Sequence, residues 1–199
     1  MTIDHPHTIA VWAEGTSALD LEPIMGDKSS PSGMPWPADR ADLRHFRETT
    51  RGHVLIMGYT TFTHLPAELK LPGSLAERPI IVLTRSHLAK VTEETVYTDA
   101  IRATYPGNTT EAGVVIHNLQ HLPEYEGKPI AVIGGPQVIE LFEPFYDELV
   151  VTHFVGRRYK GDVRAPSDSF MDNFNPTARK LLDSGARVTN FERRIPKEN

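Results

Sequence analysis

The sequence contains no cysteine and no long hydrophobic run. Without cysteine there can be no disulfide framework, no thiolate metal site and no cysteine nucleophile. No apolar stretch approaches the length that crosses a bilayer, and the start, Met1 to Pro6, lacks a basic region followed by an apolar stretch. We therefore expect a cytoplasmic protein whose chemistry comes from other side chains.

An excess of basic residues is also missing. The formal net charge is -5 and the isoelectric point is about 6.0. These values disfavour a nucleic-acid or membrane-surface binder, which needs clustered lysine and arginine. The 199 residues are 39% hydrophobic and 24% charged, as in ordinary globular proteins, and they contain no internal repeat. We predict one domain over residues 1–199, in which any bound anion meets a local site.

Short apolar runs alternate with stretches of helical spacing. The runs are almost wholly apolar, which is typical of strands that are covered on both sheet faces. They are Thr8 to Ala13, Val54 to Met57, Ile80 to Leu83, Pro129 to Ile133 and Leu149 to Val155. Residues 186–194 alternate instead, as in an antiparallel edge pair. The pattern predicts an α/β fold, a three-layer sandwich with a central, mainly parallel sheet and an antiparallel C-terminal hairpin. Ligands should bind at the carboxyl ends of its parallel strands.

A long connection separates the first strand from the first helix. Residues 15–37 are rich in glycine, serine, proline and aspartate, and they end in Met34-Pro35-Trp36. A connection of this length inside a compact domain is more often functional than idle, so we interpret it as a lid. The alternative is a disordered surface insertion.

Asp42 is the first candidate for chemistry. Asp39 can cap a helix that runs from Ala41 to Thr50, and Asp42 then shares a face with Phe46, four residues on. An acid in a first turn is also simply favoured by the helix dipole. Trp36, together with the apolar residues of the helix, favours a pocket carboxylate over that structural role.

Two glycine turns and one arginine suggest a phosphate-bearing ligand. Gly58 and Thr61 lie in a turn after one apolar strand, and Gly134-Gly135 follows another. Such turns let the backbone approach a ligand and direct free N–H groups at an anion. Arg85 follows a third strand and adds a positive charge. As isolated signals, these turns could be plain helix caps, and Arg85 could be a solvated surface charge.

His117 and His121 stand four residues apart and could share a helix face. Two imidazoles at that spacing can chelate a metal, but no glutamate stands between them as the zinc-protease pattern requires. We therefore predict no metal site.

Taken together, Met34-Pro35-Trp36, Asp42-Leu43-Arg44-His45-Phe46, Met57-Gly58-Tyr59-Thr60-Thr61 and Ile133-Gly134-Gly135 resemble the dihydrofolate reductase family. The resemblance spans residues 8 to 194. Val11-Trp12-Ala13 and His45-Phe46-Arg47-Glu48 resemble its actinobacterial branch. The resemblance implies an NADPH-dependent reductase of 7,8-dihydrofolate, with hydride transfer to C6 and protonation at N5 through solvent that the lid admits. It also implies a monomer that binds antifolate inhibitors and neither nucleic acid nor membrane.

The resemblance assigns roles to individual residues. The catalytic group is Asp42, which binds the pterin, with Thr152 supporting the acid and Trp36 as the lid tryptophan. The substrate-binding group is Val11, Trp12, Ala13, Leu43, Phe46, Leu65, Arg78 and Ile133, and in it Arg78 would grip the substrate's glutamate carboxylate. The cofactor-binding group is Ala13, Leu19, Gly58, Tyr59, Thr60, Thr61, Leu83, Thr84, Arg85, Gly134, Gly135, Pro136, Gln137 and Val138.

The sequence departs from the family pattern at several positions. Tyr59 replaces an arginine that commonly contacts the 2'-phosphate, and Ile139 replaces a tyrosine near the nicotinamide. Asp20-Leu21 replaces Ile-Gly in a lid that is longer than usual, and His64 replaces a serine. Two alternatives remain open at this stage. One is a reductase of a riboflavin-pathway pyrimidine, and the other is a non-catalytic NADPH-binding protein.

Overall fold

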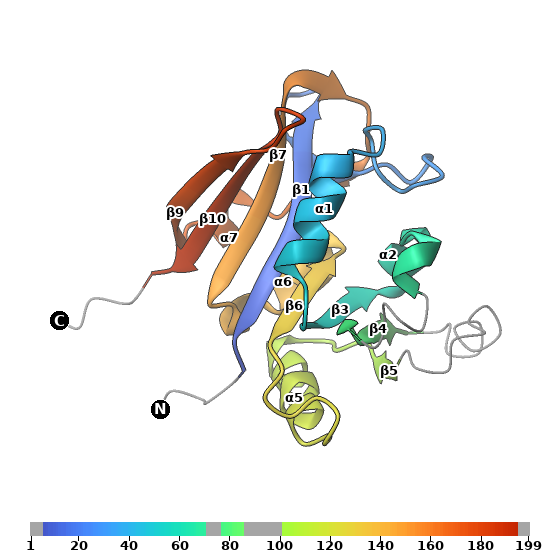
Figure 1. Ribbon diagram of the computed structural model, residues 1–199, viewed down its shortest axis with the longest axis vertical. Helices are drawn as coiled ribbons and strands as arrows, with labels where there is room; N and C mark the ends of the chain where they lie inside the picture. Colours follow the sequence, from blue (N-terminus) through green and yellow to red (C-terminus); the bar gives the residue numbers. More distant parts are fainter. Residues whose placement is uncertain (1–5, 71–76, 86–100, 195–199) are drawn as a thin grey trace.

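A central sheet with helices on both faces forms the protein (Figure 1). The computed structural model describes residues 6–70, 77–85 and 101–194. The sheet order in this part of the chain is β5-β4-β3-β6-β1-β7-β10-β9, and β2 and β8 extend it beside β1. The strands are β1 (Thr8–Ser17), β2 (Pro23–Gly26), β3 (Val54–Gly58), β4 (Ile80–Thr84), β5 (Ile101–Thr104), β6 (Ile130–Gly134), β7 (Glu148–Tyr159), β8 (Val163–Arg164), β9 (Phe174–Leu181) and β10 (Arg187–Arg193).

Each sheet face carries its own apolar cluster and its own helices. The helices are α1 (Arg40–Thr49), α2 (Tyr59–His64), α5 (Thr109–Gln120), α6 (Pro136–Leu141) and α7 (Asp168–Met171), with short 3-10 turns at Ala67–Lys70 and Glu143–Phe145. Phe46 of α1 and Phe62 of α2 pack with Val11 and Ile133 on one face. Residues of α5, α6 and α7 pack against the other face, for example Phe170 near Trp12. The predicted three-layer sandwich is therefore confirmed.

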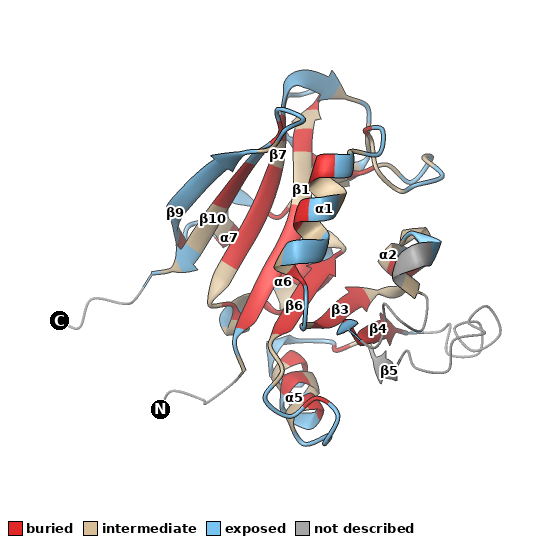
Figure 2. Cartoon of the chain, viewed as in Figure 1, coloured by how far each residue is buried: buried red, intermediate tan, exposed pale blue. Residues whose placement is uncertain are grey.

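The strand directions follow the prediction as well. Six strands, β5, β4, β3, β6, β1 and β7, are joined by parallel pairing, and β7, β10 and β9 are joined by antiparallel pairing. The C-terminal pair differs in one detail, because β10 lies between β7 and β9 and only β9 forms the edge. Figure 2 shows β9 mostly exposed beside the buried inner strands.

The lid contains regular structure that the sequence did not indicate. β1 continues past Ala13 to Ser17, and β2 pairs with it antiparallel at Gly15 and Thr16. The short strand β8 then pairs with β2. An uninterrupted loop from Gly15 was therefore the wrong expectation, since backbone pairing between distant segments extends the strand.

The helix that carries Asp42 begins as predicted. Asp39 is the N-cap, and its Oδ1 accepts hydrogen bonds from the backbone N–H groups of Ala41 (2.8 Å) and Asp42 (2.9 Å). This cap satisfies two of the free donors at a helix start. The cap thus fixes where the helix begins and, with it, the backbone position of Asp42.

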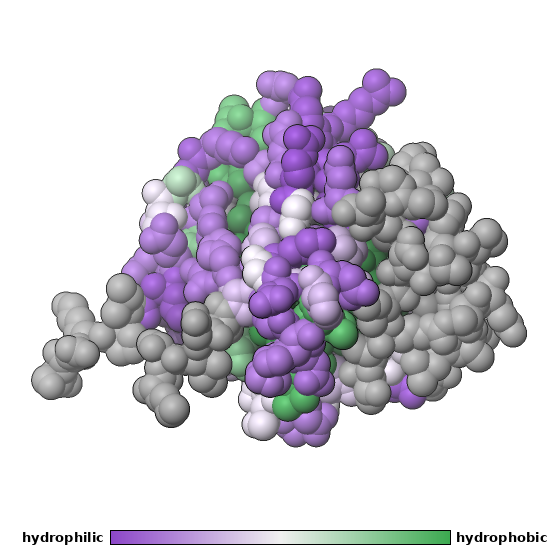
Figure 3. Space-filling model, turned by 60° about the horizontal axis from the view of Figure 1, so that its bottom comes forward, coloured by the Kyte–Doolittle hydropathy of each residue, from purple (hydrophilic) through white to green (hydrophobic). Residues whose placement is uncertain are grey.

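The outer surface is mainly polar. Figure 3 shows hydrophilic residues covering most of the described part of one face, with hydrophobic residues in smaller areas. None of the described helices is long and apolar enough to cross a membrane.

Candidate active site

Asp42 lies in the first turn of α1, and its side chain reaches Thr152 in the first half of β7. Its carboxylate is largely buried and accepts a hydrogen bond from the Thr152 hydroxyl. Burial raises the pKa of Asp42, the Thr152 hydrogen bond opposes that rise, and the negative charge of Asp39 adds to it. Thr152 itself is only 4% exposed and pairs with Ala13 of β1. The result is a single acid in a poorly hydrated place, held by a neutral donor.

Most predicted substrate-binding residues lie on the Asp42 side of the sheet. Val11 and Ile133 are buried there, and Phe46 and Leu65 pack against the same cluster. Leu43, one residue after the acid, is half-buried on α1. The structure thus brings apolar side chains from β1, β6, α1 and the end of α2 to one sheet face, as a flat aromatic substrate requires.

Trp12 differs from the other predicted substrate residues. Because side chains alternate along a strand, its indole lies on the opposite sheet face from Val11, with the ring of Phe170 at 6.1 Å. The indole N–H donates to Glu14 Oε2 at 3.0 Å, and the other oxygen of Glu14 pairs with His153 Nδ1 at 2.9 Å. The indole of Trp12 therefore faces away from the Asp42 side of the sheet, and its predicted role in substrate binding stays a prediction. Glu14 and His153 were not predicted, because their contact depends on the register of β1 with β7.

Trp36 ends the lid in an aromatic cluster. It is 6% exposed, and its ring centroid lies 4.6 Å from that of Phe154 and 5.5 Å from that of Tyr159. Ala13 packs against the same cluster. A Cβ at Gly15 would lie 2.8 Å from Tyr159 Cδ2 and 3.1 Å from Trp36 Cζ3, so a residue without a side chain is needed there. The lid tryptophan is thereby fixed close to Ala13, the neighbour of Thr152.

Arg78 is the buried cation of this region. It is 7% exposed, its Nη1 donates to the carbonyl of Arg47 at 2.9 Å, and its Nη2 lies 3.6 Å from Glu77 Oε2. Burial lowers the pKa of Arg78, and the nearby charge of Glu77 opposes this. Its predicted role toward a substrate carboxylate stays a prediction, and its contact with the carbonyl connects it to the far end of α1.

The two glycine turns lie next to each other at the carboxyl ends of β3 and β6. Parallel pairing places Met57 opposite Gly134, and α2 and α6 begin directly after Gly58 and Gly135. A Cβ at Gly134, where φ is +142°, would lie 3.1 Å from Thr61 Oγ1. The peptide bond between Gly134 and Gly135 is cis. The two turns therefore form one narrow, glycine-lined surface with a hydroxyl beside it.

The remaining predicted cofactor residues lie in three places, and they differ in exposure. Those that surround the two turns are Tyr59, Thr60, Pro136, Gln137 and Val138, all in α2 or α6. Leu83 and Thr84 are buried at the end of β4, whereas the guanidinium of Arg85 is exposed and stacks 4.2 Å above the ring of Tyr105. Leu19 is 85% exposed in the turn after β1. Ser86, beside Arg85, lies outside the described residues.

An ion pair between Asp20 and Arg164 joins the lid to β8. The pair is bidentate, with one oxygen of Asp20 accepting from Arg164 Nη1 at 3.0 Å and the other from Nη2. The hydrogen bond from Arg164 keeps the pKa of Asp20 well below its usual range. Leu21, next to it, has a φ of +70°, a left-handed conformation that side chains rarely adopt. The pair joins residues 144 apart, so no local signal could have revealed it.

His45 is a second buried group that the sequence did not single out. It is 8% exposed, its Nδ1 lies 3.0 Å from Lys180 Nζ, and its Nε2 has no hydrogen-bond partner. Burial lowers the pKa of His45, and the positive charge of Lys180 lowers it further. His45 thus connects α1 to β9 through Lys180.

Metal ligands do not gather in the described residues. His117 and His121 stack on α5 with ring centroids 4.1 Å apart. In the ranges given above, no three histidine, aspartate or glutamate side chains come close enough to hold an ion.

Comparison with known proteins agrees with the geometry. The family model for dihydrofolate reductase matches residues 17–190. Dihydrofolate reductase of Lactococcus lactis is 29% identical over 90% of this chain and 89% of its own length. That of Mycobacterium tuberculosis is 31% identical over 78% of each chain. The structure of dihydrofolate reductase from Enterococcus faecalis complexed with NADP(H) and RAB-propyl superposes with a TM-score of 0.66 at 19% identity, covering 95% of this chain and 97% of that one.

Proposed function

Because the chain belongs to the dihydrofolate reductase family, we propose that its reaction takes place between Asp42 and the two glycine turns. The reaction is the NADPH-dependent reduction of 7,8-dihydrofolate to 5,6,7,8-tetrahydrofolate. The observation that carries the proposed location is the largely buried carboxylate of Asp42, whose pKa is raised, beside the apolar cluster on this face of the sheet.

The residues at the glycine turns fit the cofactor. A Cβ at Gly134 would fill the space that a pyrophosphate or ring needs, and Thr61 stands beside it as a hydroxyl donor. When bound, NADPH supplies the hydride for C6 of the substrate. In our proposal Gly58, Thr61, Gly134 and Gly135 hold it, and Arg85 at the end of β4 binds its 2'-phosphate as a charge-assisted donor.

Asp42 would bind and orient the pterin. An ionised carboxylate accepts hydrogen bonds from an amino group and a ring N–H at once, which fixes the plane of the substrate. The apolar surroundings from Phe46, Leu65 and Ile133 exclude water and strengthen these bonds. The hydrogen bond from Thr152 favours the ionised carboxylate and so opposes the rise in the pKa of Asp42 that burial causes. Trp36 would close the pocket from the lid side.

We also propose the finer features that the resemblance implies. They are kinship with the actinobacterial branch, a single domain over residues 1–199, a monomer and a cytoplasmic location. Antifolates would bind in the place of the substrate. The branch assignment is supported by Val11-Trp12-Ala13, while the mycobacterial and lactococcal relatives are about equally similar to this chain.

The direct test measures loss of NADPH absorbance with purified protein and 7,8-dihydrofolate, beside NADH and a control without substrate. Turnover that depends on dihydrofolate is the expected result. NADPH binding without turnover would contradict the proposed site, and would direct the search to another substrate.

Cofactor preference is tested at Arg85. We expect Arg85→Ala to weaken NADPH binding by about 10- to 100-fold and NADH binding hardly at all, because a charged hydrogen bond contributes about 1.5–3 kcal/mol. Dissociation constants for both cofactors are compared by fluorescence titration, with Arg85→Lys as the variant that retains the charge. Equal losses for the two cofactors would show that Arg85 does not bind the 2'-phosphate.

A further inference from the structure

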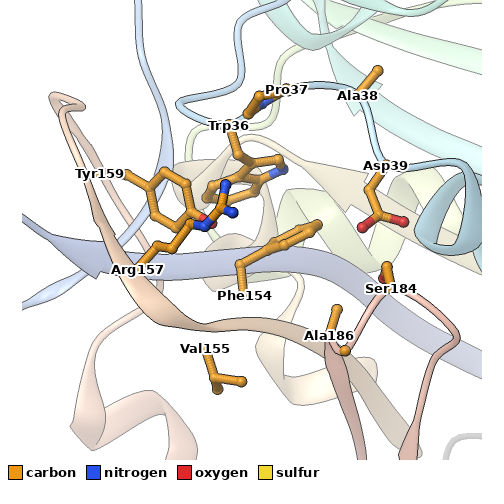
Figure 4. Close-up of a pocket in the computed structure, with 11 residues that line it drawn as sticks. Trp36, Pro37, Ala38, Asp39, Phe154, Val155, Arg157, Tyr159, Ser184 and Ala186 are labelled. Atoms are coloured by element: carbon orange, nitrogen blue, oxygen red, sulfur yellow. The ribbon is translucent and has the colours of Figure 1, made fainter.

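A cavity of about 350 Å³ has Trp36 in its wall (Figure 4). Three segments form it, namely the end of the lid, the outer half of β7 and the turn between β9 and β10. Its lining residues are Trp36, Pro37, Ala38, Asp39, Phe154, Val155, Arg157, Tyr159, Ser184, Gly185 and Ala186. None of the residues predicted to bind substrate or cofactor other than Trp36 contributes to this lining.

Aromatic rings form the apolar part of the cavity. The ring centroid of Trp36 lies 4.6 Å from that of Phe154 and 5.5 Å from that of Tyr159. Val155 extends this surface and is 50% exposed. A planar ring that enters the cavity can therefore stack or pack edge-on, which adds to the gain from burial.

One cation and one carboxylate provide the polar part. The side chain of Arg157 extends toward Trp36 and Tyr159, and the carboxylate of Asp39 points toward Ser184 (Figure 4). Arg157 makes no ion pair with any described acidic residue, although the chain as a whole is acidic. A cavity-lining arginine that forms no ion pair with the described acidic residues, beside aromatic rings in the cavity wall, is suited to a carboxylate, which it can bind with two parallel hydrogen bonds.

We propose that this cavity is a second ligand site, which takes a small planar aromatic carboxylate. The aromatic cluster would hold the ring of the ligand, and Arg157 would bind its carboxylate. Asp39 would repel an anion, so the carboxylate lies at the Arg157 end and any amino group of the ligand lies at the Asp39 and Ser184 end.

A ligand in the cavity would affect the active site through two contacts. Trp36 forms part of the cavity and also packs with Ala13, and Asp39 caps the helix that carries Asp42. A bound ring would hold Trp36 in its present place. Resting on the proposed function, this predicts partial inhibition of turnover that added dihydrofolate does not relieve.

The test uses 2-naphthoate as the probe and 2-naphthamide as its uncharged counterpart. Binding to the full-length protein is measured by calorimetry and by the fluorescence of the two tryptophans. We expect 2-naphthoate to bind at least about tenfold more tightly than the amide, and Arg157→Ala to remove that difference, as expected for one charge-assisted pair. Arg158→Ala is the matched control, because Arg158 is an exposed neighbour on β7 that does not line the cavity. The affinity of Arg158→Ala for 2-naphthoate should stay within about twofold of the wild type, since solvent and salt screen an exposed charge that lies outside the cavity.

Saturating NADP+ and folate distinguish this site from the Asp42 site. Binding of 2-naphthoate that persists with both present, and that depends on Arg157, supports the proposal. Binding that folate abolishes, or that is equal in Arg157→Ala and Arg158→Ala, overturns it. Because this readout needs no turnover, it fails or succeeds independently of the reductase assay.

Discussion

Asp42 and Asp20 are two aspartates in opposite electrostatic situations. Asp42 is largely buried, its donor is the neutral hydroxyl of Thr152, and its pKa is raised. Asp20 is exposed in the lid, its donor is the guanidinium of Arg164, and its pKa is lowered. One carboxylate is thus difficult to ionise, and the other is difficult to protonate.

The difference in burial and in partner favours different roles for the two aspartates. A buried acid without a cationic partner decreases the stability of the fold, so its presence indicates a binding role. An exposed ion pair contributes little to stability, because water solvates both groups well in the absence of the partner. It can nevertheless select a position for a mobile segment. The contrast supports the proposed binding role of the acid on α1, and it favours a positioning role for the acid in the lid.

The largest expected effect is loss of turnover on substitution of the buried acid. Asp42→Asn keeps the shape but can no longer accept two hydrogen bonds from the pterin, so we expect kcat/KM to fall by about 10²- to 10⁴-fold near neutral pH. Steady-state kinetics measure this, and NADPH titration serves as the control because its affinity should be nearly unchanged. Turnover like that of the wild type would remove Asp42 from the mechanism.

A smaller effect is expected when the buried acid is retained but loses its hydrogen-bond donor. Thr152→Val retains the shape of the side chain and removes the hydroxyl that donates to the Asp42 carboxylate. The pKa of Asp42 should rise further, which moves the acid limb of the kcat/KM profile to higher pH and lowers turnover at pH 7 by about tenfold.

Thr189→Val is the matched control for this pH profile. Thr189 is equally buried on β10, where it pairs with Val151. An identical shift of the profile in both variants would mean that Thr152 acts only through packing.

The two aspartates also show how far sequence reasoning extends. The phase of the helix that begins after Asp39 was sufficient to place Asp42 beside Phe46, because helical spacing is local. The contact of Asp42 with Thr152 depends on how α1 packs over β7, and the pair of Asp20 with Arg164 joins residues 144 apart. Neither can be derived from spacing along the chain.

The same limit applies to the strands. The inner parallel strands were predicted because burial on both faces makes them almost wholly apolar. β2 and β8 are short, and in β9 only Phe174 is buried. These strands exist because a neighbouring strand offers free backbone groups, which leaves no trace in their own composition.

Asp42→Asn should raise the stability of the fold, although it lowers turnover. Because the folded-state pKa of Asp42 is raised, its ionised form destabilises the fold at pH values above that pKa, and the penalty disappears as the pH falls through it toward 3.8. Asp42→Asn should therefore be more stable than the wild type at pH 7, by about 1 kcal/mol or roughly 2–4 °C in Tm. The gain should shrink on acidification.

Thermal unfolding at pH 7 and at pH 4.5 measures this gain. Glu48→Gln, an exposed acid on the same helix, is the control for loss of one negative charge. A Tm difference that stays constant with pH would show that burial of the Asp42 carboxylate is not its cause.

The smallest expected effect concerns the lid pair. Arg164→Gln removes the partner of Asp20 while leaving a polar side chain, so the lid loses a preferred position but the core is untouched. We expect turnover to change by no more than about fivefold at low salt, because exposed pairs are weak. The change should be an increase if lid opening limits the rate. At about 1 M salt, where screening extends over roughly 3 Å, variant and wild type should converge.

Arg44→Gln is the control for the lid pair, since Arg44 forms an equally exposed pair with Asp183 outside the lid. It should leave turnover unchanged at every salt concentration. A double-mutant cycle with Asp20→Asn isolates the pair itself, because removing Arg164 should have no further effect once Asp20 has lost its charge. A salt-independent change, or one as large as that of Asp42→Asn, would mean that the Asp20–Arg164 pair takes part in chemistry, and the contrast between the two aspartates would no longer hold.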